Sequence, residues 1–261
     1  MNKTVFITGA SSGIGFELAY IFAKNKTNLV LAARSKDKLD LMAEDITKKF
    51  KVSVITFVKD LSSLSACKEV YENIKKENIK IDFLVNNAGF GNYGFFTETD
   101  LQRELDMINL NIAALTYFTK VFAKEMKQRS FGKILNVSST AAFQPGPLMA
   151  VYYATKAYVQ SFSEAVANEL KDTGVTVTAL CPGPTESGFQ SAAQLNNVKL
   201  FTERKLPTSA DVAQFGYDAM MKGQTVAVHG LLNKIGTMAV RFVPRNLAVK
   251  SVRKIQETRN K

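Results

Sequence analysis

The sequence predicts an α/β fold with a parallel sheet and helices on both faces of the sheet. Short apolar, β-branched runs alternate with longer amphipathic stretches along roughly the first 230 residues. Runs that are apolar throughout are typical of parallel strands, and helix-length connections are what such strands require. With 46% hydrophobic residues, the chain of 261 residues has enough apolar side chains for one large core.

Seven strands are expected from the apolar runs, and helices fill the intervals. The strands are Val5–Thr8, Leu29–Ala32, Val54–Val58, Phe83–Val85, Ile134–Val137, Val175–Leu180 and Val226–Val228. Helical periodicity covers about 13–25, 36–49, 63–77, 98–128 with a break, 151–172 and 209–222. No linker or repeat divides the sequence, so we predict one domain over 1–230 and a helical C-terminal appendix over 231–261 packed on it.

Composition argues against several classes of function. Cys67 and Cys181 are far apart and not in a metal-binding spacing. His229 is the only histidine, which argues against a Ser-His-Asp hydrolase and a histidine-rich zinc site. We therefore expect no metal, and no catalytic role for His229. The apolar run near the N-terminus is too short for a signal peptide or a membrane span, so we expect a cytoplasmic protein.

The net charge of +11 is concentrated at the C-terminus, where eight Lys and Arg residues and one acid, Glu257, follow position 228. The tail lacks a basic motif interleaved with aromatic residues, so we expect no nucleic-acid partner. Its apolar residues recur at helical spacing and are interrupted at Pro244. Such a segment can lie on an anionic membrane or pack over a substrate entrance or a partner subunit. We favour packing, with at most weak lipid contact.

A glycine-rich turn follows the first expected strand and opens the first helix. It runs Thr8-Gly9-Ala10-Ser11-Ser12-Gly13-Ile14-Gly15. Glycines there permit a tight turn and let backbone N–H groups approach a pyrophosphate at a helix N-terminus. The spacing departs from the common Gly-x-Gly-x-x-Gly pattern, and a turn without a ligand is the alternative.

Arg34 ends the second expected strand, where an acidic residue would bind a ribose 2′-hydroxyl. A guanidinium suits a 2′-phosphate instead, and Lys36 and Lys38 add charge, so we predict NADP(H). A solvated basic loop is the alternative. Asp60, after the third strand, suits an adenine amino group, or is simply an exposed turn residue.

Polar and small residues end three further strands, at the sheet edge where ligands bind. Asn87-Ala88-Gly89 suits a close approach to a ribose, or only a turn. Ser138-Ser139 follows the fifth strand, and Pro182-Gly183 the sixth. Asn111 lies within an apolar helical stretch, where a buried amide needs a partner.

Tyr152 and Lys156 are four residues apart and therefore share one face of a helix. An ammonium beside a phenol favours the phenolate and lowers a pKa that is normally about 10. The phenol then becomes an acid–base group near neutral pH. An ordinary aromatic–lysine pair is the alternative. The neighbouring Tyr153 lacks this spacing to Lys156.

In their order and positions these motifs resemble the classical short-chain dehydrogenase/reductase family, over about residues 3–230. The resemblance implies a Rossmann-type doubly wound parallel sheet and a catalytic tetrad of Asn111, Ser139, Tyr152 and Lys156, with Ser138 a weaker candidate than Ser139. It also implies NADP(H) binding by Gly9, Ser11, Ser12, Gly13, Ile14, Gly15, Arg34, Asp60, Asn87, Ala88, Gly89, Tyr152, Lys156, Pro182, Gly183, Thr185 and Ser187.

The implied function is hydride transfer between NADP(H) and a small-molecule carbonyl or alcohol. Tyr152 would donate the proton, Ser139 hold the oxygen, Lys156 lower the tyrosine pKa and contact the ribose, and Asn111 hold a relay water. Family members commonly pair through the helices near 107–128 and 151–172, which implies a homodimer or homotetramer. The rival hypothesis is a dinucleotide-binding regulator or scaffold without turnover. Aromatic and aliphatic residues suited to a hydrophobic substrate, or to core or dimer contacts, are Phe90, Tyr93, Phe95, Phe96, Phe143, Leu148 and Phe189.

Overall fold

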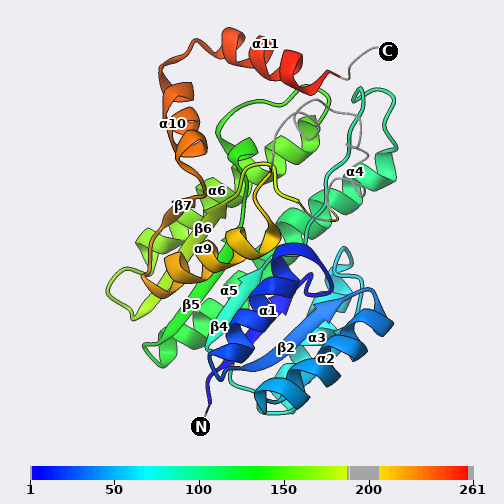
Figure 1. The fold of residues 1–261 in the computed structure, drawn as a ribbon, viewed down its shortest axis with the longest axis vertical. Helices are drawn as coiled ribbons and strands as arrows, with labels where there is room; N and C mark the ends of the chain where they lie inside the picture. Colours follow the sequence, from blue (N-terminus) through cyan, green and yellow to red (C-terminus); the bar gives the residue numbers. More distant parts are fainter. Residues whose placement is uncertain (1, 187, 189–205, 258–261) are drawn as a thin grey trace.

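A computed structural model describes residues 2–186, 188 and 206–257, and its centre is a sheet of seven parallel strands (Figure 1). The sheet order is β3-β2-β1-β4-β5-β6-β7. The strands are β1 (Thr4–Thr8), β2 (Asn28–Ala33), β3 (Val54–Val58), β4 (Phe83–Asn86), β5 (Gly132–Val137), β6 (Val175–Cys181) and β7 (Val226–Val228). The predicted doubly wound parallel sheet of seven strands is confirmed, with strand ends shifted by two residues at most.

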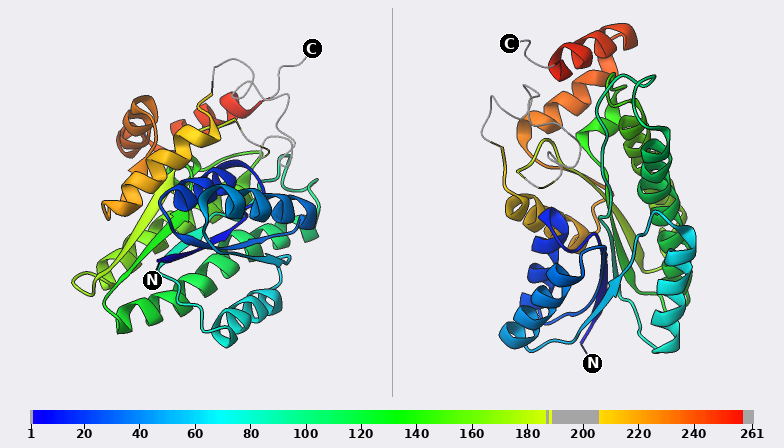
Figure 2. Two further views of the ribbon diagram at one scale, coloured as in Figure 1. Left: turned by 60° about the horizontal axis from the view of Figure 1, so that its bottom comes forward. Right: turned by 90° about the vertical axis from the view of Figure 1, so that its right-hand side faces the viewer.

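Helices cover both faces of the sheet (Figure 2). One face carries α1 (Gly13–Lys24), α2 (Lys36–Phe50) and α9 (Ser209–Met221), and the other carries α3 (Leu64–Lys76), α5 (Leu115–Gln128) and α6 (Ala150–Glu169). Each face has its own apolar core, because the strand side chains alternate between the two. Phe22 is buried in the first core and Phe6 in the second, where its ring lies 5.1 Å from that of Phe118.

The winding direction of the sheet reverses between β1 and β4. From β1 the chain proceeds to β2 and β3 on one side, and the later strands add on the other side. Val5 is therefore paired with Leu29 of β2 and with Phe83 of β4. Ligands of open parallel sheets bind in the crevice beyond the strand ends at such a reversal.

The break expected within the helical region 98–128 takes the form of a π-helical turn. The chain runs from α4 (Leu101–Ile108) through η1 (Asn109–Ala114) directly into α5. Wide turns of this kind are uncommon in proteins, but those that occur are often at functional sites. Asn111 lies within this turn, 2% exposed.

Two C-terminal helices lie beyond the strand ends, at the end of the molecule opposite the N-terminus (Figures 1 and 2). They are α10 (Leu231–Ala239) and α11 (Arg245–Gln256), joined by the short η3 (Val240–Phe242). The Tyr93 hydroxyl donates a hydrogen bond of 2.7 Å to the Gln256 carbonyl oxygen, which ties the end of α11 to the segment after β4. In the described ranges, no helix has the length and apolar character needed to span a bilayer.

Candidate active site

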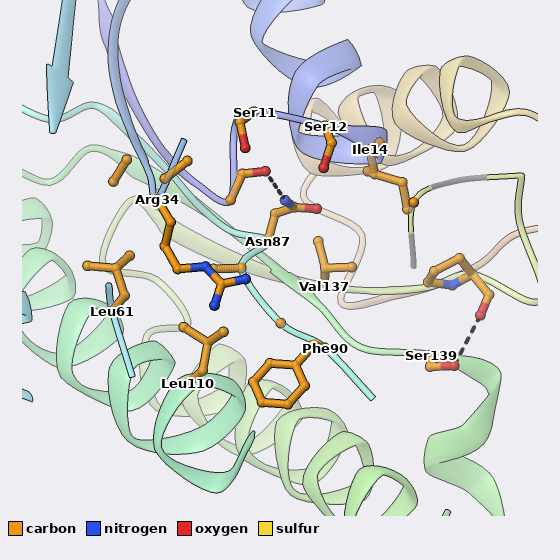
Figure 3. Close-up of a pocket in the computed structure, with 18 of the residues that line it drawn as sticks. Ser11, Ser12, Ile14, Arg34, Leu61, Asn87, Phe90, Leu110, Val137 and Ser139 are labelled. Atoms are coloured by element: carbon orange, nitrogen blue, oxygen red, sulfur yellow. Dashed lines mark hydrogen bonds between the residues drawn. The ribbon is translucent and has the colours of Figure 1, made fainter. Parts of the chain in front are cut away.

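A cavity of about 450 Å³ lies at the reversal point, beyond the ends of β1 and β4 (Figure 3). It extends from the glycine-rich turn to the Tyr152 phenol. Of the residues predicted for the site, it is lined by Gly9, Ser11, Ser12, Gly13, Ile14, Arg34, Asp60, Asn87, Ala88, Gly89, Ser139, Tyr152, Lys156, Pro182, Gly183 and Thr185. Cavities of this volume hold cofactors in many proteins.

The glycine-rich turn opens α1 with its first backbone N–H groups near this cavity. Gly9 and Gly13 adopt φ of +67° and +57°, values that side chains rarely permit. The Ser12 side chain makes no capping hydrogen bond, and the first turn carries no acidic residue. Gly15 has a packing role instead, because a Cβ there would lie 2.4 Å from the Asn87 amide nitrogen. The turn therefore presents a helix N-terminus suited to an anion.

The Asn87 side chain joins the segment after β4 to the glycine-rich turn. Its amide donates hydrogen bonds to the carbonyl oxygens of Thr8 and Gly9, at 3.1 and 3.0 Å (Figure 3). The Thr8 hydroxyl accepts from the backbone N–H groups of Asn87 and Ala88. Asn87 was predicted as a ribose contact. In the structure its amide holds two strand ends together, and Thr8 was the missed partner.

Arg34 lines the end of the cavity at which the sequence predicts the adenosine part of the cofactor. Its guanidinium lies 3.9 Å from the Asp60 carboxylate, and both side chains are largely exposed. Ser35 and Lys38 also line the cavity. Lys36, expected to add charge there, instead pairs with Asp40 along α2 at 2.5 Å and does not line the cavity.

Ser139 and Ser138 have different environments, although they are adjacent. The Ser139 hydroxyl lines the cavity, accepts from the Ala141 backbone N–H at 3.1 Å and donates to the Pro182 carbonyl at 3.4 Å (Figure 3). Ser138 is 2% exposed and donates to the Lys156 carbonyl oxygen at 3.0 Å. Both serines line the first cavity, but only Ser139 also lines the second cavity, and its role toward a substrate stays a prediction.

Lys156 and Tyr152 are buried together at the inner end of the cavity. The Lys156 ammonium donates to the Val137 carbonyl at 2.8 Å and lies 5.8 Å from the Tyr152 ring centroid. Burial lowers the pKa of Lys156 to about 8. Burial also raises the pKa of Tyr152 well above its ordinary value, against a smaller lowering by its hydrogen bond with Ser139.

The predicted lowering of the Tyr152 pKa by Lys156 is therefore wrong for this structure. Spacing along the helix brings the two side chains close, as expected. The sequence does not show how completely both are buried, and desolvation of the phenolate raises the pKa by more than the hydrogen bond with Ser139 lowers it. Tyr152 is consequently a protonated phenol at neutral pH.

Asn111 lies behind the cavity wall, in contact with the segment that follows β4. Its amide oxygen accepts from the Phe90 backbone N–H at 3.2 Å, and its amide nitrogen donates to the Phe90 carbonyl and the Thr155 hydroxyl. A Cβ on Gly89 would lie 2.9 Å from the Asn111 oxygen and 3.6 Å from the Lys156 nitrogen. Only glycine fits there without displacing Asn111, so these three residues form one close-packed unit.

A second cavity of about 310 Å³ adjoins the first and shares Ser139, Tyr152 and Gly183 with it. Its other wall consists of α10, η3 and α11, with side chains that were not predicted from the sequence as site residues: Leu232, Asn233, Thr237, Val240, Val252, Ile255 and Gln256. The Tyr153 hydroxyl accepts a hydrogen bond from the Gln256 amide at this wall. The only sequence signal for this wall was the helical periodicity of the tail.

Two predicted residues of the nearby loop, Ser187 and Phe189, lie outside the described residues. Thr185 is buried, and its hydroxyl donates to the Gly183 carbonyl at 2.9 Å. Among the residues that the structure describes, no cluster of His, Cys, Asp and Glu side chains is suited to hold a metal ion.

Fold and site together define a dinucleotide-binding oxidoreductase architecture, and comparison with known proteins supplies the family. Residues 3–197 match the family model of the short chain dehydrogenases. The chain therefore belongs to the short-chain dehydrogenase family.

Individual relatives agree with this assignment. The human very-long-chain 3-oxoacyl-CoA reductase is 37% identical over 189 residues, which is 70% of this chain and 59% of that protein's length. A Sphingobium yanoikuyae short-chain dehydrogenase in complex with NADPH is 27% identical, with a TM-score of 0.83 over 99% of this chain and 98% of that one. A Comamonas testosteroni alcohol dehydrogenase specific for bulky-bulky ketones is 27% identical, with a TM-score of 0.78 over 99% and 97%.

Proposed function

We propose that the protein is an NADPH-dependent reductase of hydrophobic carbonyl compounds, or the corresponding alcohol dehydrogenase in reverse. One observation carries the proposal: Ser139 and Tyr152 line both cavities, at the place where the two meet. A cofactor in the first cavity and a carbonyl compound in the second would face each other across these two side chains.

The residues of the first cavity fit a dinucleotide. The α1 N-terminus suits the pyrophosphate, and Arg34 with Ser35 and Lys38 suits a 2′-phosphate. Asp60, which lines the same cavity, would accept a hydrogen bond from the adenine amino group. The Lys156 ammonium is placed to bind a ribose hydroxyl while it keeps its bond to Val137. The bound nicotinamide supplies the hydride.

Tyr152 is the proposed proton donor. The phenol is protonated at neutral pH, as a tyrosine is at its ordinary pKa of about 10 or above, so it can transfer a proton to a carbonyl oxygen as negative charge develops there. The Ser139 hydroxyl orients the same oxygen by a hydrogen bond. Asn111 fixes the Phe90 backbone and packs with Gly89 beside Lys156, so it would act by holding the lysine in position.

A cofactor-binding protein without turnover is the rival function. Burial of the Lys156 ammonium is costly, as the lowered pKa shows. A protein that only bound a dinucleotide would not need this buried lysine beside a buried phenol that also lines a second cavity. Reductase and dehydrogenase relatives of the same family favour the catalytic function.

The second cavity favours an apolar substrate. Met149, Leu232, Val240, Val252 and Ile255 contribute aliphatic side chains to its walls. The named activities of the relatives, on very-long-chain 3-oxoacyl-CoA and on bulky ketones, point the same way. Hydrophobic ketones, 3-oxoacyl chains and steroid-like carbonyl compounds are the substrate classes to examine first.

We also propose a homodimer. Leu101, Leu105 and Ile108 form an exposed apolar stripe along α4, and Tyr158 on α6 is 37% exposed. A stripe of this kind at helical spacing suits a contact with the same helices of a second copy. Light scattering at micromolar concentration should give twice the mass of one chain, whereas a monomeric mass would contradict the proposal.

Turnover of NADPH with a panel of carbonyl compounds tests the enzymatic proposal. Absorbance of NADPH should fall in the presence of hydrophobic ketones and remain constant without them. Ketones of increasing apolar size should show rising kcat/KM until the second cavity is filled. Tight NADPH binding with no oxidation by any member of the panel would favour the binding protein instead.

A further inference from the structure

The apolar face of α10 points away from the protein. Leu231, Ile235, Met238 and, one turn beyond, Phe242 recur at spacings of three or four residues, and their exposures are 74%, 55%, 59% and 87%. Thr237, on the opposite side of the helix, is 8% exposed. An ordinary surface helix buries its apolar stripe and exposes its polar one. The outer stripe of α10 therefore lacks the cover that such a surface normally has.

Basic residues accompany this stripe along α10, η3 and α11. Residues 231–257 contain six Lys and Arg residues and one acid, Glu257. Among the described residues, Glu257 pairs with Arg253, and the other five cations have no ion pair. Those five are Lys234, Arg241, Arg245, Lys250 and Lys254. Lys250 and Lys254 lie one turn apart on the exposed side of α11, next to Leu247, which is 54% exposed.

The two helices are positioned to meet a surface. They lie at one end of the molecule, beyond the strand ends and away from α1, α2 and α3 (Figures 1 and 2). The inner side of α11 is fixed to the protein, since Ala248, Val252 and Gln256 are buried and Arg253 lies 4.9 Å from the Phe95 ring centroid. The outer apolar stripe of α10 is therefore connected, through η3, to a helix that is fixed to the protein.

We propose that α10 and α11 form a docking surface for an anionic lipid bilayer. The outer stripe of α10 enters the boundary between headgroups and acyl chains, and the five unpaired cations lie against the anionic headgroups. A second copy of the chain fits less well, because it would bring an equal set of positive charges against the first. An apolar stripe together with positive charge is complementary to an anionic bilayer, which has an apolar interior and negatively charged headgroups.

Docking has a consequence for access to the second cavity, and this step depends on the proposed function. Leu232 of α10 and Ile255 of α11 line that cavity, as does Val240 of the η3 turn between them. A bilayer against α10 and α11 would therefore bring the substrate cavity close to the phase in which hydrophobic carbonyl compounds dissolve. Such substrates would reach Tyr152 with a short aqueous path or none.

Vesicle flotation of the full chain tests the docking directly. At about 0.15 M NaCl, the partition coefficient should be at least about tenfold higher for phosphatidylcholine vesicles with about 30% phosphatidylserine than for phosphatidylcholine alone. At about 1 M NaCl, where the Debye length falls to roughly 3 Å, most of this difference should disappear.

Two variants separate the apolar and the charged contributions. Ile235→Asp with Phe242→Asp, and Lys250→Glu with Lys254→Glu, should each lower the partition coefficient by at least about tenfold. The matched control is Leu41→Asp with Lys48→Glu on α2, where Leu41 is 69% exposed, and it should bind like the wild type. Circular dichroism melting of each variant verifies that the fold is retained.

Three results would overturn the proposal: equal binding to neutral and anionic vesicles, no binding at all, or equal losses in the control. If Phe242→Asp instead lowers the molar mass in solution while vesicle binding is unchanged, the occupant is a second copy. Turnover of a water-soluble ketone by the same variants should match the wild type, because the substituted side chains line neither cavity. Absence of turnover in every form would contradict the proposed function and leave the vesicle result standing.

Discussion

The two cavities that meet at Tyr152 are constructed in different ways. The first is formed by backbone turns at the ends of neighbouring strands, held by bonds such as those from Asn87 to Thr8 and Gly9. The second depends on side chains brought together from distant parts of the chain, as in the contact between Tyr153 and Gln256, 103 residues apart. The first cavity therefore depends on local backbone geometry, whereas the second depends on how distant parts of the chain pack together.

The largest expected effect concerns the residue that both cavities share. Tyr152→Phe should lower kcat by about 10²–10⁴-fold, because it removes the only proposed proton donor. The Kd for NADPH should change little, since the ring still fills its place in the wall. Single-turnover kinetics and cofactor titration would measure the two effects separately. A large loss of NADPH affinity with normal kcat would show that Tyr152 belongs to the cofactor cavity alone.

A smaller effect is expected at the far end of the first cavity. Arg34→Ala should weaken NADPH binding by about ten- to a hundredfold and leave NADH binding nearly unchanged, because a guanidinium–phosphate contact is lost. Lys36→Ala removes the same charge from a side chain that pairs with Asp40 outside the cavity. The control should keep the wild-type ratio of the two Kd values. If Arg34→Ala and Lys36→Ala gave the same ratio of the Kd values for NADPH and NADH, the preference for NADPH would be due to overall positive charge and not to Arg34.

The sequence located most residues of the first cavity, whereas for the second it indicated only that the tail could pack over a substrate entrance. Strand ends and turn residues are local features, so the glycine-rich turn, Arg34 and Ser139 were found where the structure places them. The outward apolar face of α10 was not predictable, since periodicity gives a stripe without saying which way it points. The sequence also did not show how deeply Lys156 and Tyr152 are buried. This burial raises the pKa of Tyr152, where a lowering was expected.

The free energy of unfolding should depend on pH in a way that reflects the burial of Lys156. Because the pKa of this lysine is lowered to about 8 in the folded protein, the unfolded chain binds more protons between about pH 8 and the ordinary value of 10.5. The free energy of unfolding therefore rises with pH across this window. Between pH 7 and 10 the wild type should gain about 2 kcal/mol relative to Lys156→Met.

Urea denaturation at several pH values would measure this difference. Tyr152 is present in both proteins, so its own titration cancels in the comparison. Parallel stability curves would mean that Lys156 keeps its ordinary pKa, and hence that its ammonium is better solvated than its burial indicates.

The smallest expected effect concerns the wall of the second cavity. Tyr153→Phe removes the acceptor of the Gln256 amide, and the amide oxygen of Gln256 is already buried without a partner among the described residues. We expect a loss of about 1 kcal/mol in unfolding free energy and only a minor change in kcat. A double-mutant cycle with Gln256→Ala should show that the two substitutions are not additive, since they remove one shared bond. If Tyr153→Phe instead abolished turnover while Tyr152→Phe was mild, the proton donor would be Tyr153, and the second cavity rather than the cofactor cavity would contain the catalytic phenol.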